Sequence, residues 1–264
     1  DANNEEINFE IEGKNSIFNQ NKKTLEIKED VVLKDFLKNF KIYSDKIIYN
    51  KSEEVVTSYN DTKINYNNKF IILTKNISFF IKKNLFNTKK KTIITDNFDN
   101  KFELSSLEFN LEDKTFKAKQ IKLTDTKNNY LELSNGYVDL KSNQLIGSDF
   151  NLNFEKNLFG NSENDPRLIG RYIITNKSET IMKKSSFTTC KKVDGKCPAW
   201  SISADEVVHK KDKKRIEYKN AWLEIYDKPV AYFPYFFHPD PSVKRQSGFL
   251  FPQFINSSNL GFST

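Results

Sequence analysis

A repeat of thirty residues constrains the fold of this chain more than any other feature of its sequence. Apolar or aromatic residues stand thirty positions apart at five successive places, Ile17, Ile47, Ile77, Leu107 and Tyr137. Eight residues further on comes a second, mostly apolar set, at Leu25, Val55, Leu85, Thr115 and Leu145. Polar residues typical of turns lie between the two sets, so each unit predicts a strand, a hairpin turn and a second strand. Stacked units of this kind build an elongated β structure in which each repeat packs on its neighbours.

Alternation inside the units places apolar side chains on one face of the predicted sheet. If the sheet folds over, these faces line one long interior. We expect that interior to be an apolar groove formed by Ile47, Tyr49, Ile77, Phe79, Ile81, Leu107, Phe109, Leu111 and Tyr137. A filled core, in which the same side chains pack only against one another, fits the periodicity equally well.

Helical patterns are scarce. Asp30 to Phe40 would fit one amphipathic helix, but β-branched residues begin it and strand units flank it. No apolar run approaches the ~20 residues of a membrane helix. The chain begins at Asp1 without a methionine, so we expect a processed or trimmed form.

The composition excludes several classes of function. With 37% hydrophobic and 14% aromatic residues the chain is expected to fold. The net charge of +7 comes from scattered lysines, which argues against nucleic-acid binding and suits a solvated face or an anionic lipid. Two histidines, no GxSxG motif and no Gly-rich phosphate loop indicate neither an enzyme nor a cofactor. The two cysteines, Cys190 and Cys197, have no zinc-like spacing to a histidine and fit free thiols or a disulfide.

Prolines punctuate an aromatic stretch near the end of the sequence. The run from Pro229 to Pro252 reads PVAYFPYFFHPDPSVKRQSGFLFP and holds five prolines. Because proline lacks a backbone donor and fixes φ, this run fits neither a helix interior nor an ordinary central strand. An edge strand that leads into a linker is the plain interpretation.

Three ordered motifs resemble the LptD (OstA, Imp) family of outer-membrane lipopolysaccharide-assembly proteins. They are NDPRLIG at 164–170, FTTC at 187–190 followed by PAWSISA at 198–204, and the proline-rich run with its HPDPSVKRQSGFL at 238–250. Their order and spacing are similar to those of the alphaproteobacterial branch. The first 150 residues share only the less specific OstA-type strand repeat.

The resemblance implies an all-β fold, a β-taco or open β-jelly roll of OstA-type repeats. It implies a periplasmic jelly-roll domain at 1–240 and, at 241–264, a junction with the first strands of an outer-membrane barrel that is otherwise absent. The implied function is lipopolysaccharide transport and assembly at the outer membrane. The implied partners are the lipid, an LptA-type bridge protein that adds a strand near Ile7 to Ile11, and an LptE-type lipoprotein through the missing barrel. An LptA-like bridge or a structural β-solenoid without a barrel is the alternative.

The resemblance also assigns roles to cysteines and prolines. Cys190 matches a family cysteine that pairs with the barrel in some members. Cys197 is an extra cysteine nearby, and the turn-forming residues between the two favour a local Cys190–Cys197 disulfide worth ~2.5 kcal/mol by the loop-entropy argument. At the junction, the prolines are implied to interrupt strand pairing and leave a seam through which lipid leaves, at Pro234, Pro239, Pro241 and Pro252.

Overall fold

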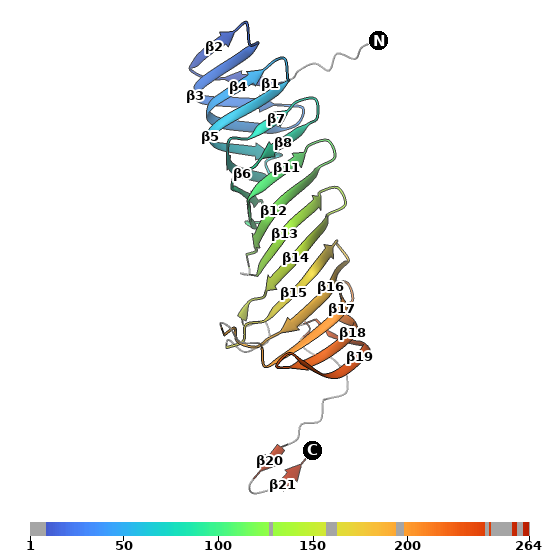
Figure 1. Ribbon diagram of the computed structural model, residues 1–264. Helices are drawn as coiled ribbons and strands as arrows, with labels where there is room; N and C mark the ends of the chain where they lie inside the picture. The colour runs from blue at the N-terminus through green and yellow to red at the C-terminus, as the bar shows by residue number, and fades with distance from the viewer. Residues whose placement is uncertain are drawn as a thin grey trace, which may run out of the picture.

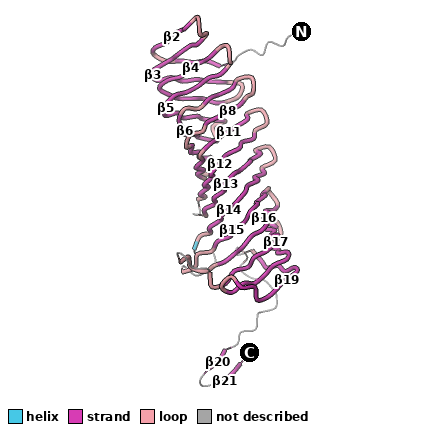
Figure 2. Tube along the Cα trace, in the orientation of Figure 1, coloured by secondary structure: helices cyan, strands magenta, loops and turns pink. Residues whose placement is uncertain are grey.

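The computed structural model describes residues 9–126, 129–156, 163–193, 198–240, 243, 255–257 and 261–263. Within these residues the chain forms strands joined by turns and no α-helix, so the all-β prediction is confirmed. The strands stack in chain order along one long axis (Figure 1), and strand and loop alternate throughout (Figure 2). No helix in the described part of the chain is long and apolar enough to span a bilayer.

The strands are β1 (Phe9–Glu12), β2 (Asn15–Asn19), β3 (Thr24–Asp35), β4 (Phe40–Asn50), β5 (Val55–Tyr66), β6 (Phe70–Lys75), β7 (Ser78–Phe80), β8 (Leu85–Thr88), β9 (Thr92–Asp96), β10 (Lys101–Leu104), β11 (Ser106–Asn110), β12 (Thr115–Thr124), β13 (Tyr130–Asp139), β14 (Gln144–Asn153), β15 (Arg167–Thr175), β16 (Glu179–Thr188), β17 (Trp200–Lys210), β18 (Arg215–Ile225), β19 (Lys228–Pro239), β20 (Ile255–Ser257) and β21 (Gly261–Ser263). The helical interpretation of Asp30 to Phe40 is wrong. Its β-branched start continues β3, and a turn separates β3 from β4. Tertiary pairing on both sides therefore overrides the local 3.6-residue pattern.

The antiparallel sheet is folded into two walls. In β3, for example, Thr24–Lys28 pairs with β2 in wall A, and Val32–Asp35 pairs with β1 in wall B. Wall A also contains β7, β8 and β11, and wall B contains β6, β9 and β10. From β12 to β19 each strand runs through both walls and pairs with the next strand along the chain. The result is the β-taco or jelly-roll arrangement that was expected.

A crease marks the line where strands pass from one wall to the other. At the crease the register shifts, or one residue of each strand drops out of the pairing, as Asn220 and Pro234 do between β18 and β19. Several crease residues take left-handed φ angles, including Asn60 at 63°, Asp149 at 49° and Asn220 at 50°. Asn and Asp tolerate this conformation better than most residues. From β12 to β19 each repeating unit is thus two strands, each creased once.

Hydroxyl groups satisfy the carbonyls that the crease removes from the ladder. Ser44 Oγ donates to the Tyr59 carbonyl at 3.0 Å, and Thr92 Oγ1 donates to the Lys90 carbonyl at 3.0 Å. Ser44 and Thr92 are both buried. Because an unpaired buried carbonyl is costly, these side chains stabilise the bend in the first half of the molecule.

Further along, glycines in one wall receive large side chains from a neighbouring row. A methyl group on Gly170 would lie 2.6 Å from the Phe150 ring, and one on Gly147 would lie 2.8 Å from a Leu133 methyl. Gly170 and Phe150 are register partners within wall B, whereas Gly147 lies in wall A and Leu133 in wall B, so the second contact joins the two walls beside the crease. By contrast, the first third of the interior is filled by aromatic rings, where Phe79 stacks on Phe86 with centroids 4.6 Å apart.

The domain boundary at residue 240 stays a prediction. β19 ends at Pro239, and a turn follows in which the Val243 amide donates to the Asp240 carbonyl at 2.9 Å. β20 and β21 pair with each other. Pro241 and Pro252 lie outside the described residues.

Replacing Gly170 with alanine should lower the free energy of unfolding by about 1–3 kcal/mol, since the new methyl overlaps a ring that has little room to move. Chemical denaturation measures the loss. Gly147→Ala is the matched control and should cost less, because it meets the flexible ends of Leu133. Phe150→Leu should restore part of the loss in Gly170→Ala, so additive effects of the two changes would contradict the interlocking contact.

Candidate functional site

An unbroken row of apolar side chains runs along the inner face of wall B. Each member is paired with the next by the strand register, across fifteen strands from β1 to β19. The row, hereafter the wall B row, is Ile11, Leu33, Ile42, Ile64, Ile72, Ile94, Phe102, Leu123, Leu131, Leu152, Leu168, Phe187, Ile202, Leu223 and Ala231. It presents a continuous apolar surface from one end of the stack to the other.

Wall A contributes a second inward row that changes character along its length. Its register-paired members, the wall A row, are Leu25, Tyr49, Val56, Phe79, Phe86, Phe109, Phe116, Val138, Leu145, Thr175, Thr180, His209, Ile216 and His238. The row is apolar as far as Leu145. Beyond it come two threonines, a histidine, an isoleucine and a histidine, so this row is mostly polar near β19. The next inward row of wall A, nearer the crease, stays apolar there, with Ile173, Met182 and Val207 buried.

A cavity of about 750 Å³ and one of about 840 Å³ are open hollows on the outer faces. The interior cavity is smaller, about 390 Å³, and lies between the two rows in the middle of the molecule. Ile94 and Leu123 line it from wall B, and Phe109 and Val138 line it from wall A. Phe98, in the turn after β9, lies at its edge and is 70% exposed. This is the apolar space that the folded sheet leaves unfilled.

Most of the residues expected in the groove face the interior. The buried ones are Ile47, Ile77, Phe79, Leu107, Phe109 and Leu111. Tyr49 and Ile81 are partly buried and pack against the same core. Of this set, Leu107 and Phe109 line the interior cavity, whereas Phe79 lies in the filled aromatic cluster. Whether any of them contacts a ligand stays a prediction.

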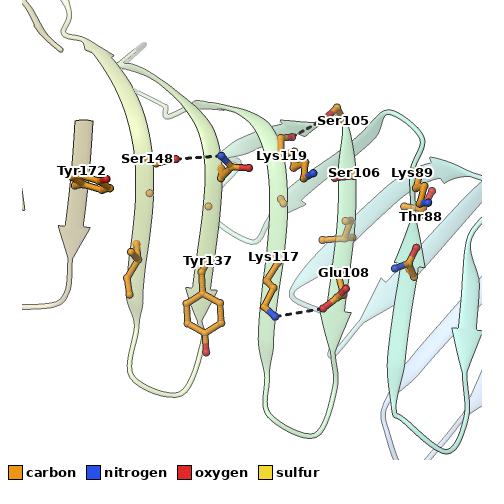
Figure 3. A pocket seen from close by; sticks show the side chains of 17 residues that line it. Thr88, Lys89, Ser105, Ser106, Glu108, Lys117, Lys119, Tyr137, Ser148 and Tyr172 are labelled. Carbon is orange, nitrogen blue, oxygen red and sulfur yellow. Dashed lines mark hydrogen bonds and ion pairs between the residues drawn. The ribbon is translucent and has the colours of Figure 1, made fainter. Parts of the chain in front are cut away.

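Tyr137 is the exception, and the expectation that it points inward is wrong. It pairs with Lys117 and Ile146 on the outer face of wall A, where it lines a surface hollow together with Lys117 and Tyr172 (Figure 3). The unit shortens by one residue between Leu107 and the inward-facing Gly136. A slip of one residue moves a side chain to the opposite face of a sheet.

The residues that are spaced thirty positions apart in the sequence do not belong to the wall B row. Its signal lies in the strand halves on the wall B side of the crease and in short strands such as β6, where Phe70, Ile72 and Thr74 alternate with outward-facing residues. The irregular crease interrupts the inward–outward alternation of side chains within a strand. An alternation that is followed along the whole strand therefore misses the wall B row.

The first two motifs of the family resemblance form one cluster at the rim of wall B. Arg167 donates from its guanidinium to the Cys190 carbonyl at 2.7 Å, and the Lys192 amide donates to Asp165 at 2.9 Å. This amide, with lesser help from Lys156, holds the pKa of Asp165 below its usual range. The cluster fixes the two long connections that flank β15 and β16. Cys190 is half-buried, and Cys197 lies outside the described residues, so the disulfide stays a prediction.

The prolines of β19 lie at positions where strand pairing does not require a backbone N–H. Pro234 occupies the crease, where β18 and β19 are unpaired, and Pro229 lies next to a register shift at Leu223/Glu224. Pro239 ends the strand. In the described residues β19 pairs only with β18, as the plain edge-strand interpretation expects. Their role as a lipid gate stays a prediction.

A polar network closes the wall A row near β19. His209 Nε2 lies 2.7 Å from a carboxylate oxygen of Asp240, and the Tyr218 hydroxyl lies 3.0 Å from His238 Nε2. Burial raises the pKa of Tyr218 well above its ordinary value, so this hydroxyl stays protonated. Burial likewise lowers the pKa of Lys211, which donates to Thr175 at 2.9 Å. These contacts hold Asp240 against the turn between β17 and β18, where the Asp240 amide also donates to the Lys214 carbonyl.

Several bacterial proteins are similar in sequence to part of this chain. An LPS-assembly protein LptD of Idiomarina loihiensis is 35% identical over 127 residues, which are 47% of this chain and 15% of that protein. The LptD of Pseudoalteromonas translucida is 37% identical over 92 residues, 35% of this chain and 12% of its own. Part of this chain is thus similar to LptD proteins.

The similarity to LptD is partial in extent. The LptD of Yersinia pestis (strain Antiqua) is 40% identical over 83 residues, 31% of this chain and 10% of that protein, so the chain spans a small part of these relatives. No protein-family model matches. A crystal structure of LptH, the LptA-homologous periplasmic component of Pseudomonas aeruginosa, covers 42% of this chain and 81% of its own at 15% identity, but its TM-score of 0.36 is too low to carry an argument. The LptD resemblance is thus confirmed, and the alphaproteobacterial assignment stays a prediction.

Filling the interior cavity should block apolar ligands. Val138→Phe adds a ring inside the cavity and should weaken binding of a fluorescent fatty acid such as cis-parinaric acid by about tenfold, or ~1.4 kcal/mol. Fluorescence titration measures the affinity. Tyr137→Leu changes the neighbouring residue on the outer face and is the matched control. Equal loss in both variants would place the fatty acid outside the groove.

Proposed function

We propose that this chain is a conduit for lipopolysaccharide on its way to the outer membrane. It receives the lipid from an LptA-type bridge protein, shields the acyl chains in the groove and passes them to a membrane barrel, with which an LptE-type lipoprotein assembles. It performs no catalysis. This places the chain at the outer membrane with the present domain in the periplasm. The wall B row, apolar across fifteen strands, is the observation that carries the proposal.

The physical need for such a row follows from the ligand. Each methylene group of an acyl chain gains ~0.8 kcal/mol on leaving water, so a lipid with several chains needs an apolar contact at every step of its path. A row without a polar member offers apolar contacts along the whole stack, although in the first third the aromatic cluster must open before a chain can enter. Exchange between such sites needs no energy source in this chain.

The sugars and phosphates of the lipid would remain outside the groove. The turn segments at the rim are polar, and the outer faces carry many matched charges, such as Glu26 with Lys28 at 2.8 Å and Lys46 at 2.9 Å. An amphiphile would therefore find an apolar interior and a wet exterior on the same element. That division matches its own two parts.

The alternative, a structural β-solenoid, requires an interior that is filled throughout. The first third of the molecule fits that description, because Phe40, Phe79 and Phe86 pack edge-to-face and stacked. The middle does not, because the 390 Å³ cavity separates the rows there. A ligand test in the middle of the chain therefore discriminates between the two functions.

A photocrosslinking side chain in place of Phe109 should capture lipopolysaccharide, since Phe109 lines the cavity. The same side chain in place of Glu108, which points to the outer face, is the control. Phe79 and Ser78 form a second pair, in which we expect weaker capture because the aromatic cluster must open first. Gel shift and mass spectrometry detect the adduct. Equal capture at Phe109 and Glu108 would favour the structural solenoid.

The bridge protein should dock at the β1 edge by strand addition. β1 and β2 each pair only with β3 among the described residues, so both present an edge at this end. Phe9→Pro removes a donor from β1 and should weaken binding of an LptA-type protein at least about tenfold. Phe18→Pro on β2 is the control and should leave the affinity intact. Calorimetry of the purified pair measures both, and the reverse pattern would move the docking site to β2.

A further inference from the structure

The most basic run of the chain, KKDKKR at 210–215, lies at the end of wall A near β19. It includes the turn between β17 and β18, which lies beside the turn between β15 and β16, because the Lys211 amide donates to the Ser178 carbonyl at 2.9 Å. Lys177 adds a cation from the second of these turns. One margin of the groove therefore carries a concentrated positive charge at this end.

Part of this charge is not matched by acidic side chains. Lys210 forms an ion pair with Glu179, and Arg215 forms one with Glu217. Asp212 is the one acidic residue within the two turns. Among the residues that the structure describes, four lysines of the two turns form no ion pair, namely Lys177, Lys211, Lys213 and Lys214. An anion bound between them would reduce the repulsion of these like charges.

One of these lysines turns toward the interior. Lys211 Nζ donates to the Thr175 hydroxyl at 2.9 Å, and the Thr175 and Thr180 hydroxyl oxygens lie 2.7 Å apart. Both threonines belong to the wall A row on the inner face. Burial lowers the pKa of Lys211, because its charge has lost water without gaining a counter-ion among the described residues. We call this site the basic corner and define it as Thr175, Lys177, Thr180, Lys211, Lys213 and Lys214.

Two other places on the groove margin do not offer an anion the same surroundings. On wall B at this end, the turn between β18 and β19 contains Tyr226, which is 68% exposed, and Asp227. In the middle of the chain, Asp96 of wall B and Asp139 of wall A line the interior cavity. Because a carboxylate repels a phosphate, the basic corner is more favourable for an anionic group than either of these places.

We propose that the basic corner binds the phosphate of a lipid whose acyl chain lies against the wall B row. Lysine ammonium groups bind phosphate oxygens as point charges, and of two hydroxyls that bond to each other one keeps a hydrogen to donate. The basic corner and the wall B row lie on opposite walls of one groove, so they contact the two parts of a single amphiphile. This inference rests on the proposed function and adds the place where the headgroup is recognised.

Two lipids with the same tetradecanoyl chain test the site, lysophosphatidic acid with a phosphate and monoacylglycerol without one. The 264-residue chain should bind lysophosphatidic acid at least about fivefold more tightly at low ionic strength, and ~1 M salt should remove the difference. Lys211→Gln with Lys213→Gln should bring the two affinities together. Lys177→Gln with Lys213→Gln, which changes exposed lysines, should act in the same direction. Titration calorimetry below the micelle concentration measures each affinity.

Lys63→Gln with Lys69→Gln removes the same charge from wall B and is the matched control, which should keep the difference between the two lipids. Equal loss in the control would assign the effect to net charge and overturn the proposal, as would an unchanged preference in both basic-corner variants. So would equal binding of both lipids to the unchanged chain, or glycerol 3-phosphate that binds as tightly as lysophosphatidic acid. If neither lipid binds, the proposed function fails as well, so the two failures are distinguishable.

Discussion

The contact between the two walls across the crease is the constraint on which the rest of the structure depends. A single antiparallel sheet of this length would expose one apolar face to water, and folding it along a crease buries that face against itself. The fold needs residues that accept the bend, such as Asn60 and Asn220 with left-handed φ angles. It also needs hydroxyls that satisfy the carbonyls freed by the bend, such as Thr92. Both devices recur along the chain.

How the walls meet decides where the interior is open. Aromatic rings fill it in the first third, and glycines such as Gly136 and Gly147 let the walls approach closely beside the crease further along. Between these closed regions the space next to Phe109 and Val138 remains free. The interior is therefore closely packed in one segment and open in another, and the proposed lipid path requires the open one. The row that crosses all segments is on wall B, and it gives the path its continuity.

The two ends of the stack differ in chemistry. At the first end, short strands present backbone edges, which suit strand addition by another β protein. At the other end, wall A becomes polar at His209 and His238, and the outer face of β19 becomes aromatic. Under the proposed function, lipid would enter at the end that presents strand edges and leave past the rim where wall A carries His209 and His238.

The sequence by itself determined the unit of the fold, because the hairpin turns repeat at a fixed interval and polar turn residues are legible without a structure. It also carried the resemblance to LptD, through motifs such as FTTC and HPDPSVKRQSGFL. Only the tertiary structure decided which face each residue occupies. The crease and one shortened unit shift the parity, which turned Tyr137 outward and concealed Ile72 and Leu123 in wall B. The face that a side chain occupies depends on how many residues lie in each bend, because one extra or missing residue reverses the alternation. The sequence shows no periodic signal for the length of a bend.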